Sequence, residues 1–396
     1  MVYRFEDCEL DPARFELRRE GETIHVERQV FDVLAYLLAH RDRVVTKAEL
    51  LDAVWGDRFV SDSALTSRLK TARRAIGDDG RDQRLISTVY GVGYRFVATV
   101  ADDVAGPLAS PAADRRAGQE IRYCTSPDGV RIAYACTGSG PPLVKAANWL
   151  THLDLEWDSP IWAHWIDALS ARHRLVRYDE RGCGLSDWEV DDISLESWVE
   201  DLELVVDSVG LDRFPLLGVS QGGAVALAYA VRHPERVSCI VLAGAYVRGR
   251  LVRATSPEER EEALLDMQVG RVGWRRDDPA YRQVFAAQFL PDADRARWDA
   301  FNALQRATTS MENVVRFLDT FAGIDVSDLA RRVSCPTLVL HARRDRRVPM
   351  EQAREIAALV PDSRVHLLDS GNHIVMADEP AWSEVLTELE DFVDRG

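Results

Sequence analysis

The chain has 396 residues, enough for two or three domains that each bury a core of their own. Its formal net charge of -16 argues against nonspecific binding to nucleic acids or membranes, although one local cationic helix is compatible with DNA binding. The six cysteines lie far apart without a Cys-x-x-Cys pair, so we expect neither a disulfide framework nor a metal site. No apolar run reaches the ~20 residues of a membrane span and no signal peptide is visible, which predicts a cytoplasmic protein that does not bind membranes.

The pattern of residues 1–100 predicts a small α+β domain. This segment is almost neutral, with 16 Lys and Arg against 17 Asp and Glu. Helical spacing of apolar residues follows over 29–39, and a second helix is expected over 47–54. Thr46 is its expected N-cap, with Glu49 at the capping-box position. Three short alternating segments before these helices indicate an antiparallel sheet: 3–10, 14–19 and 23–26.

A third helix is predicted over 63–76, and it carries four cations with no acidic residue before Asp78. A solvated cationic face is one interpretation of such a helix. The segment 85–96 favours a second interpretation, because it reads as strand, glycine-bearing turn and strand. A helix followed by a β-hairpin supplies one element for the major groove and another for the neighbouring backbone or minor groove.

The order of sheet, three helices and hairpin, together with TVYGVGYRF at 88–96, resembles the winged-helix DNA-binding domain of OmpR/PhoB-type regulators over residues 2–99. The resemblance implies binding of double-stranded DNA and, because such domains commonly bind paired half-sites, a homodimer. By position, three residues would face base edges, three would contact phosphates and two would belong to the wing: Thr66, Ser67 and Arg68; Lys70, Arg73 and Arg74; Tyr90 and Arg95.

Two departures from that family are visible. Tyr90 stands where the family often has Arg before Gly-x-Gly, so no cation is expected to enter the minor groove there. The phospho-acceptor receiver domain usual in response regulators has no counterpart in the sequence. A signal other than aspartyl phosphorylation is therefore expected.

Residues 101–120 are rich in Ala, Asp, Gly and Pro and show little apolar periodicity, which predicts a flexible linker. A hairpin pattern then opens the segment 121–396, where strands and helices alternate at the spacing of parallel βαβ units. This alternation predicts a doubly wound, mostly parallel sheet with its site at the carboxyl ends of the strands. A mostly helical insertion interrupts the alternation at about 246–326.

The motif Gly-x-Ser-x-Gly, centred on Ser220, lies between an apolar strand and an apolar helix. Its two glycines permit a sharp turn, and Gln221 offers its backbone N–H to an oxyanion from the first turn of the helix. A serine hydroxyl needs an adjacent base to become a nucleophile. His373 is the expected base and Asp345 its orienting acid, each in a loop after a predicted strand, and Asp369 is the alternative acid.

These features, with DERGCGLS at 179–186 and GNH at 371–373, resemble the α/β-hydrolase superfamily over residues 121–394. The resemblance implies a lid at 246–326, and a triad in which His373 accepts the proton of Ser220 while Asp345 orients His373. The His-Gly pair common after the first parallel strand is replaced here. The second oxyanion donor would be the N–H of Trp149, with the Asn148 amide as the alternative.

The lid insertion is rich in aromatic and methionine side chains. Most are expected to form lid core, and some, with Trp149 and Trp157, to line an apolar pocket suited to a hydrophobic ester, lactone or amide. The candidates are Met267, Trp274, Phe285, Phe289, Trp298, Phe301, Met311, Phe317 and Phe321.

Together the two resemblances predict a transcription regulator whose hydrolase domain senses a small-molecule ligand. The predicted Ser-Asp-His triad is also compatible with hydrolysis of the ligand. In that case hydrolysis would reset the signal. The alternative is a serine esterase-like enzyme with an accessory DNA-binding module. No cofactor is expected for any of these functions.

Overall fold

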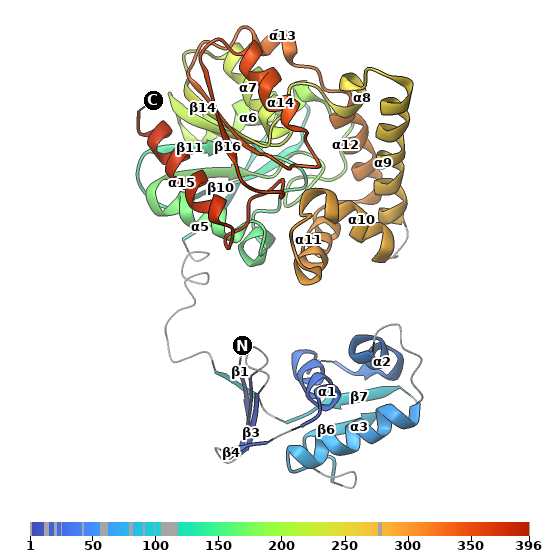
Figure 1. The fold of residues 1–396 in the computed structure, drawn as a ribbon. Helices are drawn as coiled ribbons and strands as arrows, with labels where there is room; N and C mark the ends of the chain where they lie inside the picture. Colours follow the sequence, from blue (N-terminus) through green and yellow to red (C-terminus); the bar gives the residue numbers. More distant parts are fainter. Residues whose placement is uncertain are drawn as a thin grey trace. The chain divides into compact units, whose positions relative to one another are not determined.

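In the computed structural model the chain forms two compact units, Met1–Ser110 and Pro111–Gly396, which are described separately below (Figure 1). The structure describes residues 2–11, 16–19, 22–24, 26–41, 43–55, 62–78, 82–89, 92–98, 100–103, 118–275 and 279–395.

The first unit begins with a five-stranded antiparallel sheet. Its order is β4 (Glu22–Thr23), β3 (Glu16–Arg19), β2 (Cys8–Asp11), β1 (Val2–Phe5) and β8 (Val100–Asp103). Strand β8 pairs with β1 in a register that places Val100 opposite Phe5. The predicted linker was therefore wrong at its start, because residues 101–103 extend this sheet.

Three helices and a hairpin complete the first unit: α1 (Arg28–Ala39), α2 (Lys47–Trp55), α3 (Asp62–Ala75), β6 (Ile86–Val89) and β7 (Gly93–Phe96). β7 also pairs with β5 (Val45–Thr46). The N-cap prediction is confirmed, since Thr46 Oγ1 accepts a hydrogen bond from Glu49 N at 3.2 Å. The Glu49 carboxylate instead accepts from Arg43 Nη1 at 2.9 Å and Tyr36 Oη at 3.0 Å.

The apolar stripe of α1 closes the core of this unit. Its buried residues recur at helical spacing and pack against apolar residues of the sheet, of α3 and of the hairpin. They are Val30, Phe31, Val33, Leu34, Leu37 and Leu38.

The second unit is built on an eight-stranded sheet in which six neighbouring strands run parallel. Its order is β16 (Ser363–Leu368), β15 (Thr337–Ala342), β14 (Val237–Ala243), β13 (Phe214–Val219), β11 (Pro142–Lys145), β12 (Arg174–Tyr178), β10 (Arg131–Thr137) and β9 (Glu120–Thr125). Only β9 and β10 run antiparallel to their neighbours. The central strands β13 and β14 are almost wholly buried, as near-continuous apolar runs require.

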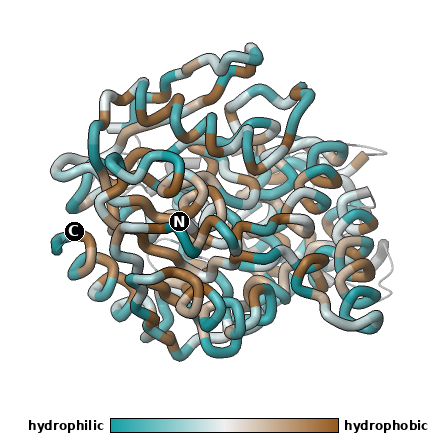
Figure 2. The backbone as a smooth tube through the Cα atoms, turned by 90° about the horizontal axis from the view of Figure 1, so that it is seen from above, coloured by the Kyte–Doolittle hydropathy of each residue, from teal (hydrophilic) through white to brown (hydrophobic). Residues whose placement is uncertain are grey.

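Helices cover both faces of this sheet. In Figure 1, α5 (Ala163–Arg172) and α15 (Pro380–Val393) lie on one face, while α6 (Leu195–Val209), α7 (Gly222–Arg232) and α14 (Met350–Leu359) lie on the other. Buried apolar residues of the sheet and these helices form one core. Figure 2 colours the hydrophobic stretches of the backbone brown. The two short helices η1 (Leu155–Asp158) and α13 (Ser327–Ala330) sit in connections between these elements.

The insertion between β14 and β15 is helical, and its helices gather at one side of the unit (Figure 1). They are α8 (Arg250–Arg253), α9 (Pro257–Arg275), α10 (Pro279–Phe289), α11 (Arg295–Thr308) and α12 (Met311–Gly323). Met311, which the sequence placed in the lid core or pocket, is instead 45 % exposed at the start of α12. In the described ranges, no helix has the length and apolarity that crossing a bilayer requires.

Candidate active site and DNA-binding surface

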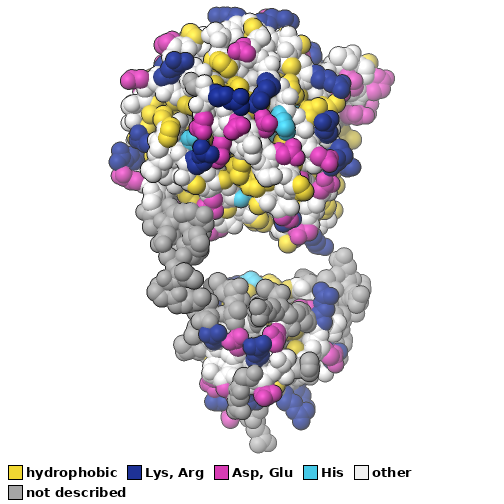
Figure 3. Space-filling model, turned by 60° about the vertical axis from the view of Figure 1, so that its left-hand side comes forward, with side chains coloured by type: hydrophobic (Ala, Val, Ile, Leu, Met, Phe, Trp, Pro, Cys, Tyr) yellow, Lys and Arg dark blue, Asp and Glu magenta, His cyan; other side chains and the backbone are white. Residues whose placement is uncertain are grey.

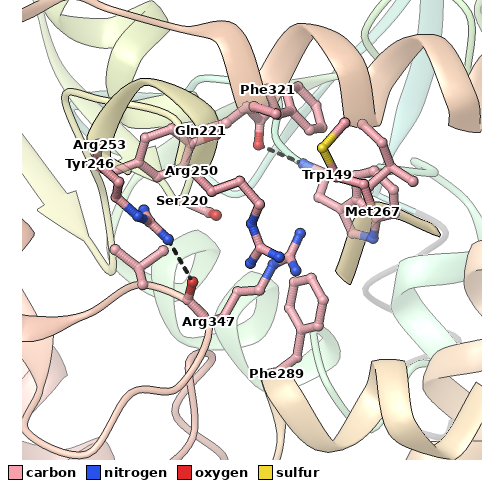
Figure 4. A pocket seen from close by; sticks show the side chains of 13 residues that line it. Trp149, Ser220, Gln221, Tyr246, Arg250, Arg253, Met267, Phe289, Phe321 and Arg347 are labelled. Carbon is pink, nitrogen blue, oxygen red and sulfur yellow. Dashed lines mark hydrogen bonds between the residues drawn. The ribbon is translucent and has the colours of Figure 1, made fainter. Parts of the chain in front are cut away.

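Ser220 occupies the turn between β13 and α7 in a left-handed backbone conformation, with φ of 53°. This strain persists because the surrounding backbone fixes the turn: Ser220 N donates to Ala243 O at 2.9 Å. The turn also needs glycine at 218, where a Cβ would lie 2.7 Å from Gly223 Cα. The result is a half-buried hydroxyl that faces a cavity at the carboxyl end of the sheet (Figure 4).

Asp345 and His373 meet beside this turn, 28 residues apart in the chain. His373 Nδ1 lies 2.7 Å from Asp345 Oδ2, and both side chains are buried. Asp345 Oδ1 accepts the backbone N–H groups of Arg347 and Val348 at 2.8 and 2.9 Å. Burial acts to raise the pKa of Asp345, but His373 and the Val348 N–H outweigh it and hold this pKa below its ordinary value.

The other imidazole nitrogen, His373 Nε2, is buried and has no hydrogen-bond partner among the described residues. The lid holds this histidine in place, since His373 N donates to Phe289 O at 2.7 Å at the end of α10. The alternative acid, Asp369, pairs with Arg344 at 2.5 Å and is 79 % exposed. The geometry therefore pairs His373 with Asp345.

The backbone N–H of Trp149, the expected second oxyanion donor, is hydrogen-bonded to the side chain of Gln221. Trp149 N donates to Gln221 Oε1 at 2.8 Å, a contact drawn as a dashed line in Figure 4. Gln221 Nε2 has only long contacts, 3.5 Å to Ala147 O and 3.4 Å to Glu180 Oε2. In this conformation the Trp149 N–H is satisfied within the protein and does not face a ligand.

Asn148, whose side-chain amide is the alternative donor, accepts a hydrogen bond from Lys145 Nζ at Oδ1, a contact that involves its acceptor oxygen and not its N–H donor. Behind it lies a cluster of buried charges that the sequence analysis missed. Arg177 pairs with Glu156 at 2.7 Å. Burial lowers the pKa of Lys145 and raises the pKa of Asp179 to about 7.

The cavity beside Ser220 has a volume of about 40 Å³, which holds only a few water molecules. Aromatic and aliphatic side chains supply part of its lining, with Trp149, Met267, Phe289 and Phe321 among them. The expectation of an apolar pocket holds only in part, because three arginines also line the cavity: Arg250, Arg253 and Arg347.

Trp157 was wrongly placed in that pocket. Its Nε1 donates to Gln119 Oε1 at 3.0 Å, and the Arg177 guanidinium lies 5.6 Å from its ring centre. It therefore belongs with the buried charges rather than with the Ser220 cavity. Several of the lid aromatics serve as core: Phe317 stacks on Trp198 with ring centres 6.1 Å apart.

In the first unit, helix α3 presents a polar face. Thr66, Ser67, Lys70 and Arg74 are exposed, as an element that reads DNA requires. Neither Lys70 nor Arg74 forms an ion pair within the part of the chain that the structure describes. Arg68 is half-buried, with Nη2 3.1 Å from Glu27 Oε2.

Arg73 must be withdrawn from the predicted phosphate contacts. Its side chain is 12 % exposed, and its guanidinium donates to Ile86 O at 2.9 Å and to Thr88 Oγ1 at 2.9 Å. It therefore fastens α3 to the first strand of the hairpin. Arg95 is exposed on β7, with Nε 3.4 Å from Arg41 O, whereas Tyr90 lies outside the described residues.

Comparison with known proteins agrees with this geometry. Residues 155–380, more than half of the chain, match the alpha/beta hydrolase fold family. The chain belongs to this family. Residues 21–96 match the family described as transcriptional regulatory protein, C terminal, so an OmpR/PhoB-type winged-helix domain and an α/β-hydrolase domain are fused in one chain. Both the predicted fold classes and the predicted resemblances are thereby confirmed.

Curated relatives of the hydrolase domain are enzymes. Pyrrolizixenacetamide deacetylase of Xenorhabdus hominickii is 27 % identical over 268 residues, covering 66 % of this chain and 94 % of that protein. 2-hydroxy-6-oxo-2,4-heptadienoate hydrolase of Pseudomonas putida is 28 % identical over 262 residues, covering 61 % of this chain and 82 % of that protein.

Solved structures resemble the same domain. An esterase from a Rhodococcus species is 26 % identical with a TM-score of 0.56, covering 69 % of this chain and 98 % of that chain. An esterase from Exiguobacterium antarcticum, at 22 % identity and a TM-score of 0.59 over 69 % of this chain and 100 % of that chain, shows the shared fold. The second unit is thus a domain of hydrolase type.

The cavity-lining residues that sequence reasoning missed in the hydrolase domain are charged. Arg250 and Arg253 lie on a four-residue helix of the lid, and Arg347 follows Asp345 by two positions. The motif around Asp345 contains five arginines from 343 to 354, so no local signal distinguishes the inward-facing one. Only contact between the lid and the β15 loop distinguishes Arg347.

Proposed function

We propose that this protein is a transcriptional regulator that binds double-stranded DNA through α3 and the β6–β7 hairpin, and binds a small ester, lactone or amide in its hydrolase domain. One observation carries the proposal: a winged-helix domain of regulatory type and an α/β-hydrolase domain occur in one polypeptide. An enzyme unconnected with transcription has no use for the first of these. By resemblance to its family, two copies would bind paired half-sites.

In the hydrolase domain we assign Ser220 as nucleophile, His373 as base and Asp345 as the acid that orients it. The 2.7 Å contact between His373 Nδ1 and Asp345 Oδ2 supports this assignment, because it leaves Nε2 available to a hydroxyl. Hydrolysis requires that Nε2 then meet the Ser220 hydroxyl, a contact that free enzymes often form only with substrate bound.

The geometry of the site without ligand favours ligand binding over fast hydrolysis of that ligand. The Trp149 N–H is already bonded to Gln221, and the cavity of about 40 Å³ is far smaller than the ~300 Å³ that ordinary ligands need. We therefore propose that a ligand rearranges the lid and the Gln221 side chain, and that this rearrangement is the signal. Slow hydrolysis would then reset it.

The DNA-binding part is tested by gel retardation of the fragment upstream of the protein's own gene. Lys70→Ala and Arg74→Ala should each weaken binding and lower the salt slope by about one, because each removes one phosphate contact. Arg18→Ala removes an equal charge from β3 and serves as the control. Unchanged binding and salt dependence in the first two variants would refute the assignment of α3.

The hydrolase part is tested with a short-chain aryl ester. Ser220→Ala should abolish turnover, with a loss on the order of 10⁶ in a fully built site. Ser208→Ala is the control, since this exposed serine of α6 does not line the Ser220 cavity. Hydrolysis that survives Ser220→Ala would remove Ser220 from its role. Ligand-dependent DNA binding that persists in Ser220→Ala would show that occupancy suffices for sensing.

A further inference from the structure

Three guanidinium groups converge on the cavity that contains the Ser220 hydroxyl (Figure 4). Arg250 and Arg253 come from α8, one turn apart, and Arg347 comes from the loop after β15. Arg253 Nη2 lies 3.5 Å from Arg347 O, which ties the two segments together across 94 residues of sequence. Positive charge is thus built into the site itself.

The carboxylates around these arginines do not balance them. Arg250 and Arg347 share Asp266 of α9, and the Arg347 Nη1 to Asp266 Oδ2 distance is 3.0 Å. Arg253 has no carboxylate within ion-pair distance among the described residues. Three positive charges face one negative charge, so two are unmatched.

Three other acidic groups near the cavity are already engaged. Asp345 is bonded to His373 and to backbone N–H groups. Glu355 pairs with Arg248 at 2.6 Å, and Glu259 accepts from Thr255 N at 2.6 Å. None of them is available to neutralise the three arginines.

The arginine side chains are largely buried, so water screens their unmatched charge only weakly. The side chains of Arg250 and Arg347 are 16 % and 13 % exposed, and the Arg347 guanidinium lies 4.7 Å above the Phe289 ring. Burial, with repulsion from Arg347 and Arg253, lowers the pKa of Arg250, yet guanidinium groups remain protonated in proteins. Like charges held together in a poorly hydrated site attract an anion.

The face of the hydrolase domain that Figure 3 shows does not share this character. On the face shown in Figure 3, Lys and Arg side chains lie interspersed with Asp and Glu. The lining of the cavity beside Ser220, by contrast, holds three arginines and no carboxylate. A second cavity, of about 1020 Å³, adjoins the first and shares Arg250 and Arg253 with it. Asp266 also lines this outer cavity, so a ligand that passes from one cavity to the other meets these groups.

We propose that the ligand carries a compact oxyanion, a carboxylate or a phosphate, which Arg250, Arg253 and Arg347 bind while its acyl carbon faces Ser220. This inference rests on the proposed function and specifies its ligand class: an anionic ester, lactone or amide. Guanidinium forks match both oxyanions in geometry. In the free protein Asp266 holds Arg250 and Arg347, and the anion of the ligand takes its place.

The test uses two aryl esters of glutaric acid, the free monocarboxylate and its methyl ester, and compares kcat/KM for the two. The wild type should prefer the charged ester. Arg253→Gln should lower this preference by about 10- to 100-fold, the loss typical of a charge-assisted hydrogen bond, and Arg253→Lys should retain part of it. Asp266→Asn should increase the preference, because it removes the competing carboxylate. Arg260→Gln, on the exposed side of α9, is the matched control.

Binding to Ser220→Ala, measured by calorimetry, separates this inference from the proposed function. Monomethyl glutarate and a phosphate monoester of similar length are the two probes, and the tighter binder identifies the oxyanion. Binding that Arg253→Gln abolishes would support the anion site even if no ester were hydrolysed. The anion site would be overturned if the protein showed no preference for the charged ester and bound neither probe. If the methyl ester were still hydrolysed in a way that depends on Ser220, the hydrolase assignment would stand.

Discussion

Gln221→Met tests whether the Gln221 side chain restrains catalysis. The Trp149 N–H must leave Gln221 Oε1, 2.8 Å away, before it can receive an oxyanion. One buried neutral hydrogen bond contributes a net ~0.5–1.5 kcal/mol, and the long Nε2 contacts add little. Methionine has similar length but is only a weak acceptor. Loss of the hydrogen bond from Trp149 N should therefore raise kcat/KM about 2- to 13-fold. The backbone N–H of residue 221 stays in place.

The same substitution should destabilise the free protein. A buried Trp149 N–H without a partner costs ~1–3 kcal/mol, so the free energy of unfolding should fall by that amount. Steady-state kinetics on an aryl ester and urea unfolding of the same preparation measure both effects. Gln119→Met is the control, because Gln119 accepts from Trp157 Nε1 outside the Ser220 cavity. It should cost stability without any gain in rate.

A folded Gln221→Met protein that loses activity would refute this reasoning. Loss of one oxyanion donor typically lowers kcat by ~10²–10³. A fall of that size would mean that the Gln221 amide supports the reaction directly. An unchanged rate would mean that the hydrogen bond to Trp149 does not have to break.

Three further predictions follow from buried groups elsewhere. Burial raises the pKa of Asp179 from 3.8 to about 7. Between these two pH values the folded protein keeps a proton on Asp179 that the unfolded chain has lost. The free energy of unfolding therefore falls as the pH rises from 3.8 to about 7. Relative to wild type, Asp179→Asn should therefore be more stable near pH 8 than near pH 5 in urea unfolding. Arg73→Ala should destabilise the winged-helix domain by ~1.5–3 kcal/mol in thermal melts, whereas Arg74→Ala should leave the melting temperature unchanged. Gly218→Ala should lower the free energy of unfolding by ~1–3 kcal/mol, because its Cβ would lie 2.7 Å from Gly223 Cα; a wild-type value would contradict the crowded turn.

Much of the architecture could be predicted from sequence, because the signals involved are local. Apolar periodicity placed α1 at 29–39, one residue short of its observed start, but it predicted a single segment at 3–10 where the structure has β1 and β2, and it missed β8. The Gly-x-Ser-x-Gly motif identified its own turn, since only glycine tolerates that approach of two backbones. Chain order and loop position singled out Asp345 and His373, which the fold brings to 2.7 Å.

What the sequence could not determine is which partner each polar side chain selects. Arg73 and Arg74 are neighbours on one cationic helix, yet the hairpin takes up only the first. Gln221 was expected to contribute its backbone N–H, and its side chain proved to hold the Trp149 N–H as well. Three arginines join the apolar side chains of the predicted pocket because α8 and the β15 loop pack against each other, with Arg253 and Arg347 94 residues apart in the chain. Periodicity reports the environment of a residue along its own element, whereas hydrogen bonds and ion pairs depend on distances between elements, and these are fixed only when the chain has folded.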